Sequence, residues 1–83
     1  PTALQSAAAI ELAAEIDALG GNAHLDVRDS QIVLLENGKL QQPVRGRCFI
    51  RTDPDQGGAV FIDGDVTRSA STLTALQHLG ITS

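Results

Sequence analysis

The stretch VRGRCFIR, residues 44–51, decides how this chain is interpreted, because it holds three of the six basic residues. Alternate side chains of a β-strand lie on the same face of its sheet. If residues 44–52 are extended, one face of the strand therefore carries Arg45, Arg47, Phe49 and Arg51. The sequence thus predicts a cationic strand face with an aromatic ring inside it.

A helix is predicted before this strand, over residues 2–19. Thr2 and Gln5 stand at capping-box spacing, and Gly20-Gly21 supplies the residues that most readily end a helix. An apolar stripe at helical spacing predicts the packing side of this helix; its members are Leu12, Ile16 and Leu19, with Ala8 and Ala9. Glu11 and Glu15 lie off the stripe, so we expect them to face solvent.

Four strands are predicted between this helix and the end of the chain. Alternation or apolar runs place them at residues 24–28, 31–36, 44–52 and 59–63. Asn37-Gly38 is the strongest two-residue hairpin signal, and it would set Leu35 opposite Leu40. Pro43 cannot donate to a ladder of hydrogen bonds, so it marks a bend or an edge.

A second helix is predicted near the end, with Ser69 or Ser71 as its cap and Gly80 after its last turn. Its apolar spacing comes from Leu73, Leu76 and Leu79. We therefore expect one α+β domain over residues 1–83, in the order α-β-β-β-β-α. Its core would be a four-stranded, mainly antiparallel meander flanked by the N-terminal and C-terminal helices.

Size and charge limit the classes of function. A chain of 83 residues has one modest core, and oligomerisation is a natural supplement to its stability. The net charge of −4 comes from residues 1–43, while residues 44–83 are balanced, so bulk charge attracts neither nucleic acid nor an anionic membrane. No apolar run reaches the ~18 residues of a membrane span. A lone cysteine without a secretion signal favours a cytoplasmic protein.

The predicted sheet has apolar residues on both faces. Ile32 and Leu34 share one face with residues of the first strand, and the other face carries Val33, Leu35, Leu40 and Phe49. Two short helices cover one face of such a sheet well, but they cover both faces less well. An uncovered apolar face typically marks an interface, so this pattern predicts an oligomer or a partner-binding protein.

The arginine face has three interpretations. Guanidinium groups pair with carboxylates of a neighbouring strand, and Asp26, Glu36, Asp63 and Asp65 are available for such pairing. The same groups bind acidic side chains of a protein partner. The third interpretation is phosphate or nucleic-acid binding, with Phe49 stacking on a base.

Catalytic and metal signals are weak. Cys48 shares its predicted face with Val44 and Ile50, which indicates a small buried side chain rather than a nucleophile. The loop DPDQGG, residues 53–58, resembles the start of a calcium loop but lacks the later ligands, and such carboxylates more often bond their own backbone. We expect no enzyme activity, no cofactor and no metal.

The predicted function is a small non-enzymatic protein-interaction module, a homo-oligomer or an inhibitor or accessory factor for another protein. The expected contact surface combines the arginine face with the acidic side of the first helix: Arg45, Arg47, Phe49, Arg51, Glu11 and Glu15. The alternative is nucleic-acid or phosphate-ligand binding through Arg45, Arg47 and Arg51. No membrane partner is expected.

Overall fold

The computed structural model describes residues 2–20, 29–55, 57 and 60–83. Its elements in chain order are α1 (Ala3–Leu19), β1 (Val33–Leu34), β2 (Leu40–Gln41) and α3 (Ala70–His78). The described residues therefore form a small α+β fold. The predicted strand at residues 24–28 lies outside them.

The first helix begins and ends where the sequence predicts. The Gln5 N–H donates to Thr2 Oγ1 (3.2 Å) and the Thr2 N–H donates to Gln5 Oε1 (2.9 Å), which completes the capping box. Gly20 follows the last turn with φ +74°, and its N–H donates to the Asp17 carbonyl (3.1 Å). A positive φ is costly for residues with a Cβ, so glycine suits this position.

The buried side of α1 differs from the predicted stripe. Ser6, Ile10, Ala13 and Ala14 are buried, while Leu12 and Leu19 are 57% and 85% exposed. Aliphatic residues occur on both sides of this helix, so periodicity alone does not choose the packing side. The structure buries the side with the smaller residues, which lets neighbouring segments approach the helix axis closely.

β1 and β2 form an antiparallel hairpin whose register is one residue from the prediction. Leu34, not Leu35, lies opposite Leu40. The Leu35 N–H donates to the Lys39 carbonyl (2.9 Å), so the loop has three residues and ends in Gly38 at φ +85°. A two-residue turn of the predicted type also needs a positive φ at Asn37, which is absent.

Ser6 joins α1 to the hairpin. Its hydroxyl donates to the Ile32 carbonyl (2.7 Å) and accepts from the Leu34 N–H (2.9 Å). A single helical side chain thus bonds to the Ile32 carbonyl just before β1 and to the Leu34 N–H within it. Ser6 is buried and the two hydrogen bonds are partly buried, which limits the access of water to these backbone groups.

The four-stranded meander is wrong: the described residues contain a two-stranded sheet, extended only by isolated bridges. Ile62 pairs antiparallel with Leu35, and the adjacent Phe61 pairs parallel with Phe49. Residues 61–62 therefore lie between the hairpin and residue 49. A meander would instead place each segment beside its neighbour in the sequence.

The predicted strand over 44–52 is broken by a tight turn. The Arg47 N–H donates to the Val44 carbonyl (3.0 Å), and Gly46 between them has φ +85°. Pro43 is buried just before this turn and has no N–H for a ladder. Glycine and proline thus redirect the chain away from β2. Beyond the turn, Cys48 and Phe49 form isolated bridges, and the Ile50 N–H donates to the Thr82 carbonyl (3.0 Å).

The last helix is confirmed, and Ser69, one of the two predicted caps, is its N-cap residue. The Ser69 side chain makes no capping bond to a backbone N–H, and its hydroxyl lies 2.8 Å from that of Ser71. Leu76 and Leu79 are buried, as the spacing predicts, and Gly80 follows at φ +89°. The chain then turns back under α3, where Ile81 is buried.

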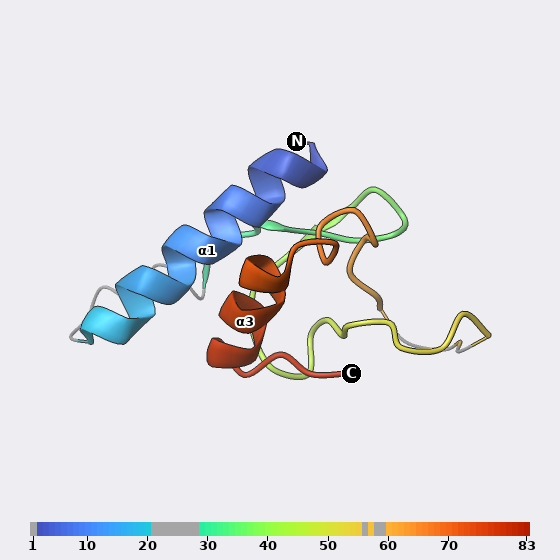
Figure 1. The fold of residues 1–83 in the computed structure, drawn as a ribbon. Coiled ribbons are helices and arrows are strands. Elements are labelled where there is room, and N and C mark those ends of the chain that lie inside the picture. Colours follow the sequence, from blue (N-terminus) through green and yellow to red (C-terminus); the bar gives the residue numbers. More distant parts are fainter. Residues whose placement is uncertain (1, 21–28, 56, 58–59) are drawn as a thin grey trace.

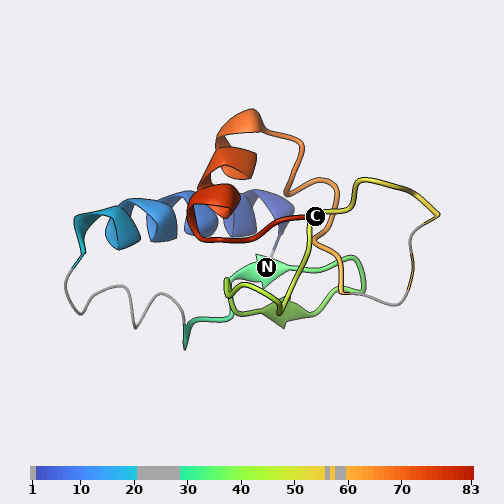
Figure 2. The ribbon, with the colours of Figure 1, turned by 90° about the horizontal axis from the view of Figure 1, so that it is seen from below.

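The helices α1 and α3 pack against each other and lie on one side of the hairpin (Figure 2). The core lies between these layers and includes Ile10, Val33, Leu35, Cys48, Ile62, Val66, Leu76, Leu79 and Ile81. Val33 and Leu35 are thus buried, so they do not form the uncovered sheet face expected from the sequence. Residues 52–55 project away from the helices (Figure 1).

Thr72 on α3 gives the first test of this core. It is buried, and its hydroxyl has no hydrogen-bond partner in the described structure. We expect Thr72→Val to raise the free energy of unfolding by about 1 kcal/mol, because burying an unpaired hydroxyl is unfavourable. Urea unfolding measures the change, and Thr74→Val, at an exposed position of the same helix, is the control. A destabilised Thr72→Val would show that the hydroxyl has a partner.

Candidate functional site

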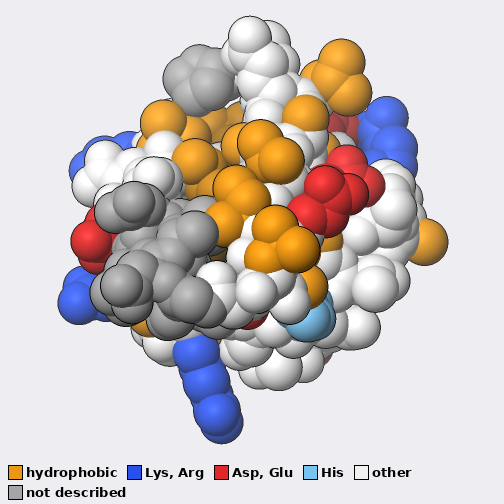
Figure 3. All heavy atoms as spheres, turned by 90° about the vertical axis from the view of Figure 1, so that its left-hand side faces the viewer, with side chains coloured by type: hydrophobic (Ala, Val, Ile, Leu, Met, Phe, Trp, Pro, Cys, Tyr) orange, Lys and Arg blue, Asp and Glu red, His pale blue; other side chains and the backbone are white. Residues whose placement is uncertain are grey.

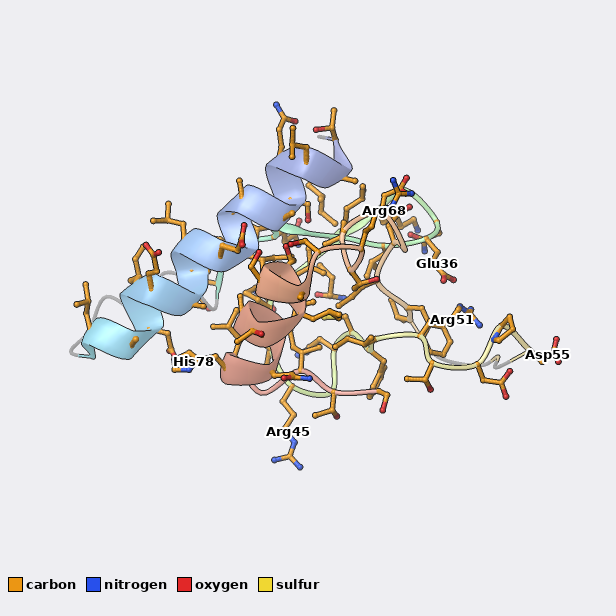
Figure 4. The ribbon with its side chains drawn as sticks, in the orientation of Figure 1. Glu36, Arg45, Arg51, Asp55, Arg68 and His78 are labelled. Carbon is orange, nitrogen blue, oxygen red and sulfur yellow. The ribbon has the colours of Figure 1, made fainter. Side chains whose placement is uncertain are left out.

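The structure does not bring the three arginines onto one face. Arg45 and Arg47 occupy the second and fourth positions of the turn at residues 44–47, and both are exposed. Arg51 lies beyond the turn, and its side chain points in a different direction from that of Arg45 (Figure 4). Phe49 is half-buried, and its backbone bonds to residues 60 and 62. The predicted cationic strand face is therefore not formed.

Arg51 is held within the molecule. Its Nε and Nη2 donate to the two carboxylate oxygens of Glu36 at 2.6 and 2.9 Å (Figure 4). Its guanidinium carbon lies 4.0 Å from the centre of the Phe61 ring, and Nη1 donates to the Asp53 carbonyl (3.1 Å). The paired hydrogen bonds lower the pKa of the Glu36 carboxyl and raise that of Arg51. This arrangement matches the pairing interpretation of the arginine, with Glu36 as the partner.

Glu11 and Glu15 lie together beside α3. They line an open groove of about 330 Å³ between α1 and α3, whose floor includes Ala14 and Ala75. His78 lies at the same groove, and its Nε2 is 3.7 Å from Asp17 Oδ2, an ion pair when the imidazole is protonated. The acidic side of α1 expected from the sequence is therefore present, far from the arginines in the chain and on another element.

The sequence interpretation missed an exposed apolar ridge on α1. We define the ridge by residues that recur every three or four positions along one side of the helix: Leu4, Ala8, Leu12, Ile16 and Leu19. Its three leucines are 81%, 57% and 85% exposed, and Ile16 is half-buried. The spacing of these residues signals an apolar helix side, but spacing alone predicts that this side packs inward, whereas the structure leaves it exposed.

A shallow hollow adjoins the ridge. It measures about 170 Å³ and lies between α1 and the chain leading into β1; Ala9, Leu12, Ala13, Ile16, Ser30 and Ile32 line it. Figure 3 shows the hydrophobic side chains gathered on this side of the molecule, with Asp and Glu side chains at one edge of the group. The ridge and the hollow together form an uneven apolar surface against which apolar side chains of another molecule can pack.

The thiol and the carboxylates considered for catalysis or metal binding are either buried or hydrogen-bonded to the backbone. Cys48 is fully buried, and burial raises the pKa of its thiol to about 11, which disfavours the reactive thiolate. The carboxylates of Asp53 and Asp63 accept from the backbone N–H groups two residues later, at 3.0 and 2.9 Å. Across the described residues, no three His, Cys, Asp or Glu side chains gather as a metal ion requires.

Comparisons with known proteins add no assignment. No protein-family model, curated protein or solved structure matches this chain. None of the described helices has the length and apolar character needed to cross a membrane.

Proposed function

We propose that this protein is a small non-enzymatic protein-interaction module whose contact surface is the apolar ridge of α1. The observation that carries the proposal is the exposure of Leu4, Leu12 and Leu19 on the longest helix. Single exposed leucines are ordinary, but several on one continuous helix side are typical of interfaces. This surface replaces the arginine face of the sequence prediction.

Burial of the ridge would contribute favourably to the free energy of a complex. Fully burying a leucine side chain contributes roughly 1.5–3 kcal/mol. Burying three leucines that are mostly exposed in the folded chain would therefore contribute several kcal/mol to the free energy of binding. A partner that covers them recovers this free energy, and Ala8 between Leu4 and Leu12 lets its backbone come close.

The alternative, phosphate or nucleic-acid binding through Arg45, Arg47 and Arg51, stays a prediction with less support. Arg51 is engaged by Glu36 and Phe61, and the other two arginines flank a glycine turn. Recognition of a phosphate backbone needs cations that act along one surface. The proposal of a protein partner does not need these residues.

A photo-crosslinking experiment tests the proposed surface. A benzophenone amino acid replaces Leu12 in one variant and Thr52, an exposed residue of the projecting loop, in a matched control. We expect irradiation in an extract of the source cells to give a discrete protein adduct from position 12 and none from position 52. Mass spectrometry then identifies the adduct as another protein or a second copy.

Two outcomes contradict the proposal. Position 12 would give no discrete adduct, or it would give the same distribution of adducts as position 52. Sedimentation of the purified protein across a dilution series measures self-association separately. A dimer that Leu12→Ser dissociates, while Val60→Ser does not, would identify the ridge as the contact between copies; Val60 is exposed elsewhere in the molecule.

A further inference from the structure

We propose that the ridge receives an amphipathic helix of a partner protein, with Lys or Arg along the flank that faces Glu11 and Glu15. This inference rests on the proposed function and specifies the chemistry of the partner. A helix that packs on an apolar surface, as in coiled coils, typically uses apolar residues at positions i, i+3, i+4 and i+7.

The charges around the ridge favour a partner helix with positive charge. Glu11 follows Ala8 by three positions, and Glu15 follows Leu12 by three, so both carboxylates border the ridge along the same edge. The helix α1 carries no Lys or Arg at all. Glu15 is exposed and Glu11 partly so, and both open onto the groove between α1 and α3. A basic flank on the partner helix meets these carboxylates, whereas an acidic flank is repelled.

The same charges disfavour a second copy packed antiparallel as the occupant. Two identical helices that pack antiparallel about a twofold axis bring the same flank of each together. Glu11 and Glu15 of one copy would then face Glu11 and Glu15 of the other, across an interface that excludes water. Among the described residues, the exposed cations Lys39, Arg45, Arg47 and Arg68 all lie outside α1.

The hollow beside the ridge supplies a position for one apolar anchor. It is formed by Ala9, Ala13 and Ile16 on α1 and by Ile32 before β1. A leucine or isoleucine of the bound helix fills this space, while its neighbours one turn away rest on Leu12 and Leu19. The basic side chains then extend over the opposite edge of the ridge toward Glu11 and Glu15.

The test uses two synthetic helical peptides that share leucines at i, i+3, i+4 and i+7. One carries lysine along its flanks and the other carries glutamate. Fluorescence anisotropy of the labelled peptides, titrated with the whole protein, gives the affinities. We expect the lysine peptide to bind at least about tenfold more tightly, since several exposed ion pairs each contribute a few tenths of a kcal/mol or more.

Matched variants separate the ridge from bulk charge. We expect Glu15→Gln to weaken lysine-peptide binding about threefold to fivefold and to flatten its salt dependence, while Asp55→Asn changes it less than about twofold. Both variants lose one negative charge, and Asp55 lies at the far loop (Figure 4). Leu12→Ser should weaken binding about tenfold and Val60→Ser should not, because only Leu12 belongs to the ridge.

The inference is overturned if the glutamate peptide binds as tightly, if the lysine peptide does not bind, or if Asp55→Asn weakens binding as much as Glu15→Gln. It is also overturned if Leu12→Ser dissociates a dimer of the free protein, which would make a second copy the occupant. In each case an adduct from position 12 would still support an interaction surface at the ridge. Loss of that adduct, by contrast, would remove the proposed function itself.

Discussion

Ser6→Ala is expected to lower the free energy of unfolding by about 2–4 kcal/mol, although alanine is the better helix former. The change removes the hydroxyl that accepts from the Leu34 N–H and donates to the Ile32 carbonyl. Both backbone groups then lose their partner on the side of β1 that α1 covers. Helix propensity returns only about 0.5 kcal/mol, so the loss of the two hydrogen bonds decides the sign.

The loss is large for a chain of this size, whose total stability is of the order of 4–12 kcal/mol. Thermal unfolding should show a decrease in Tm of about 10–25 °C, and hydrogen exchange at the Leu34 amide should accelerate. Ser71→Ala is the control, because Ser71 is exposed on α3 and its hydroxyl contacts only Ser69 among the hydrogen bonds seen. Unchanged stability with a protected Leu34 amide would show that the bridge is not needed.

Alkaline pH should destabilise the protein through Cys48. Burial raises the pKa of this thiol from 9.0 to about 11. As pH rises from 9 to 11, the unfolded chain loses the thiol proton first, so the unfolded state binds fewer protons and the free energy of unfolding falls. The full effect is about 2–3 kcal/mol, present below pH 9 and lost by pH 11.

Urea unfolding at several pH values measures this loss, with Cys48→Ala as the comparison. The variant lacks the titrating group, so its stability should start lower but decline less steeply above pH 9. The composition favours the measurement, because the chain has no tyrosine and only one lysine to titrate in the same range. Parallel pH profiles for the two proteins would contradict the assignment to Cys48.

The sequence was a reliable guide where local chemistry sets the structure. Thr2, Gln5 and Gly20 bound α1 because capping satisfies the free N–H groups and glycine accepts the conformation that ends the helix. The burial of Leu76, Leu79 and Cys48 was also predicted correctly. The helix boundaries and the two leucines depend on residues that are close in the sequence, whereas Cys48 is buried although the strand from which its burial was predicted does not form.

The sequence was a poor guide to strand pairing. Alternation in residues 44–52 favoured a strand, but Gly46 allows a positive φ and Pro43 interrupts pairing, so a turn forms instead. The hairpin register depended on whether one or two residues of Asn37-Gly38 adopt a positive φ. The position of residues 61–62 between the hairpin and Phe49 is a long-range pairing, which no local pattern specifies.

The candidate surface shows the same division. The sequence alone predicted that α1 is a capped helix with an apolar stripe and with Glu11 and Glu15 off that stripe. Which side of α1 is buried depends on tertiary contacts. Ser6 bonds to the backbone at Ile32 and Leu34, and the small Ala13 and Ala14 allow the neighbouring core residues to pack closely. Close packing rewards the side that lets neighbours approach, and the larger leucines of the opposite side are left in solvent.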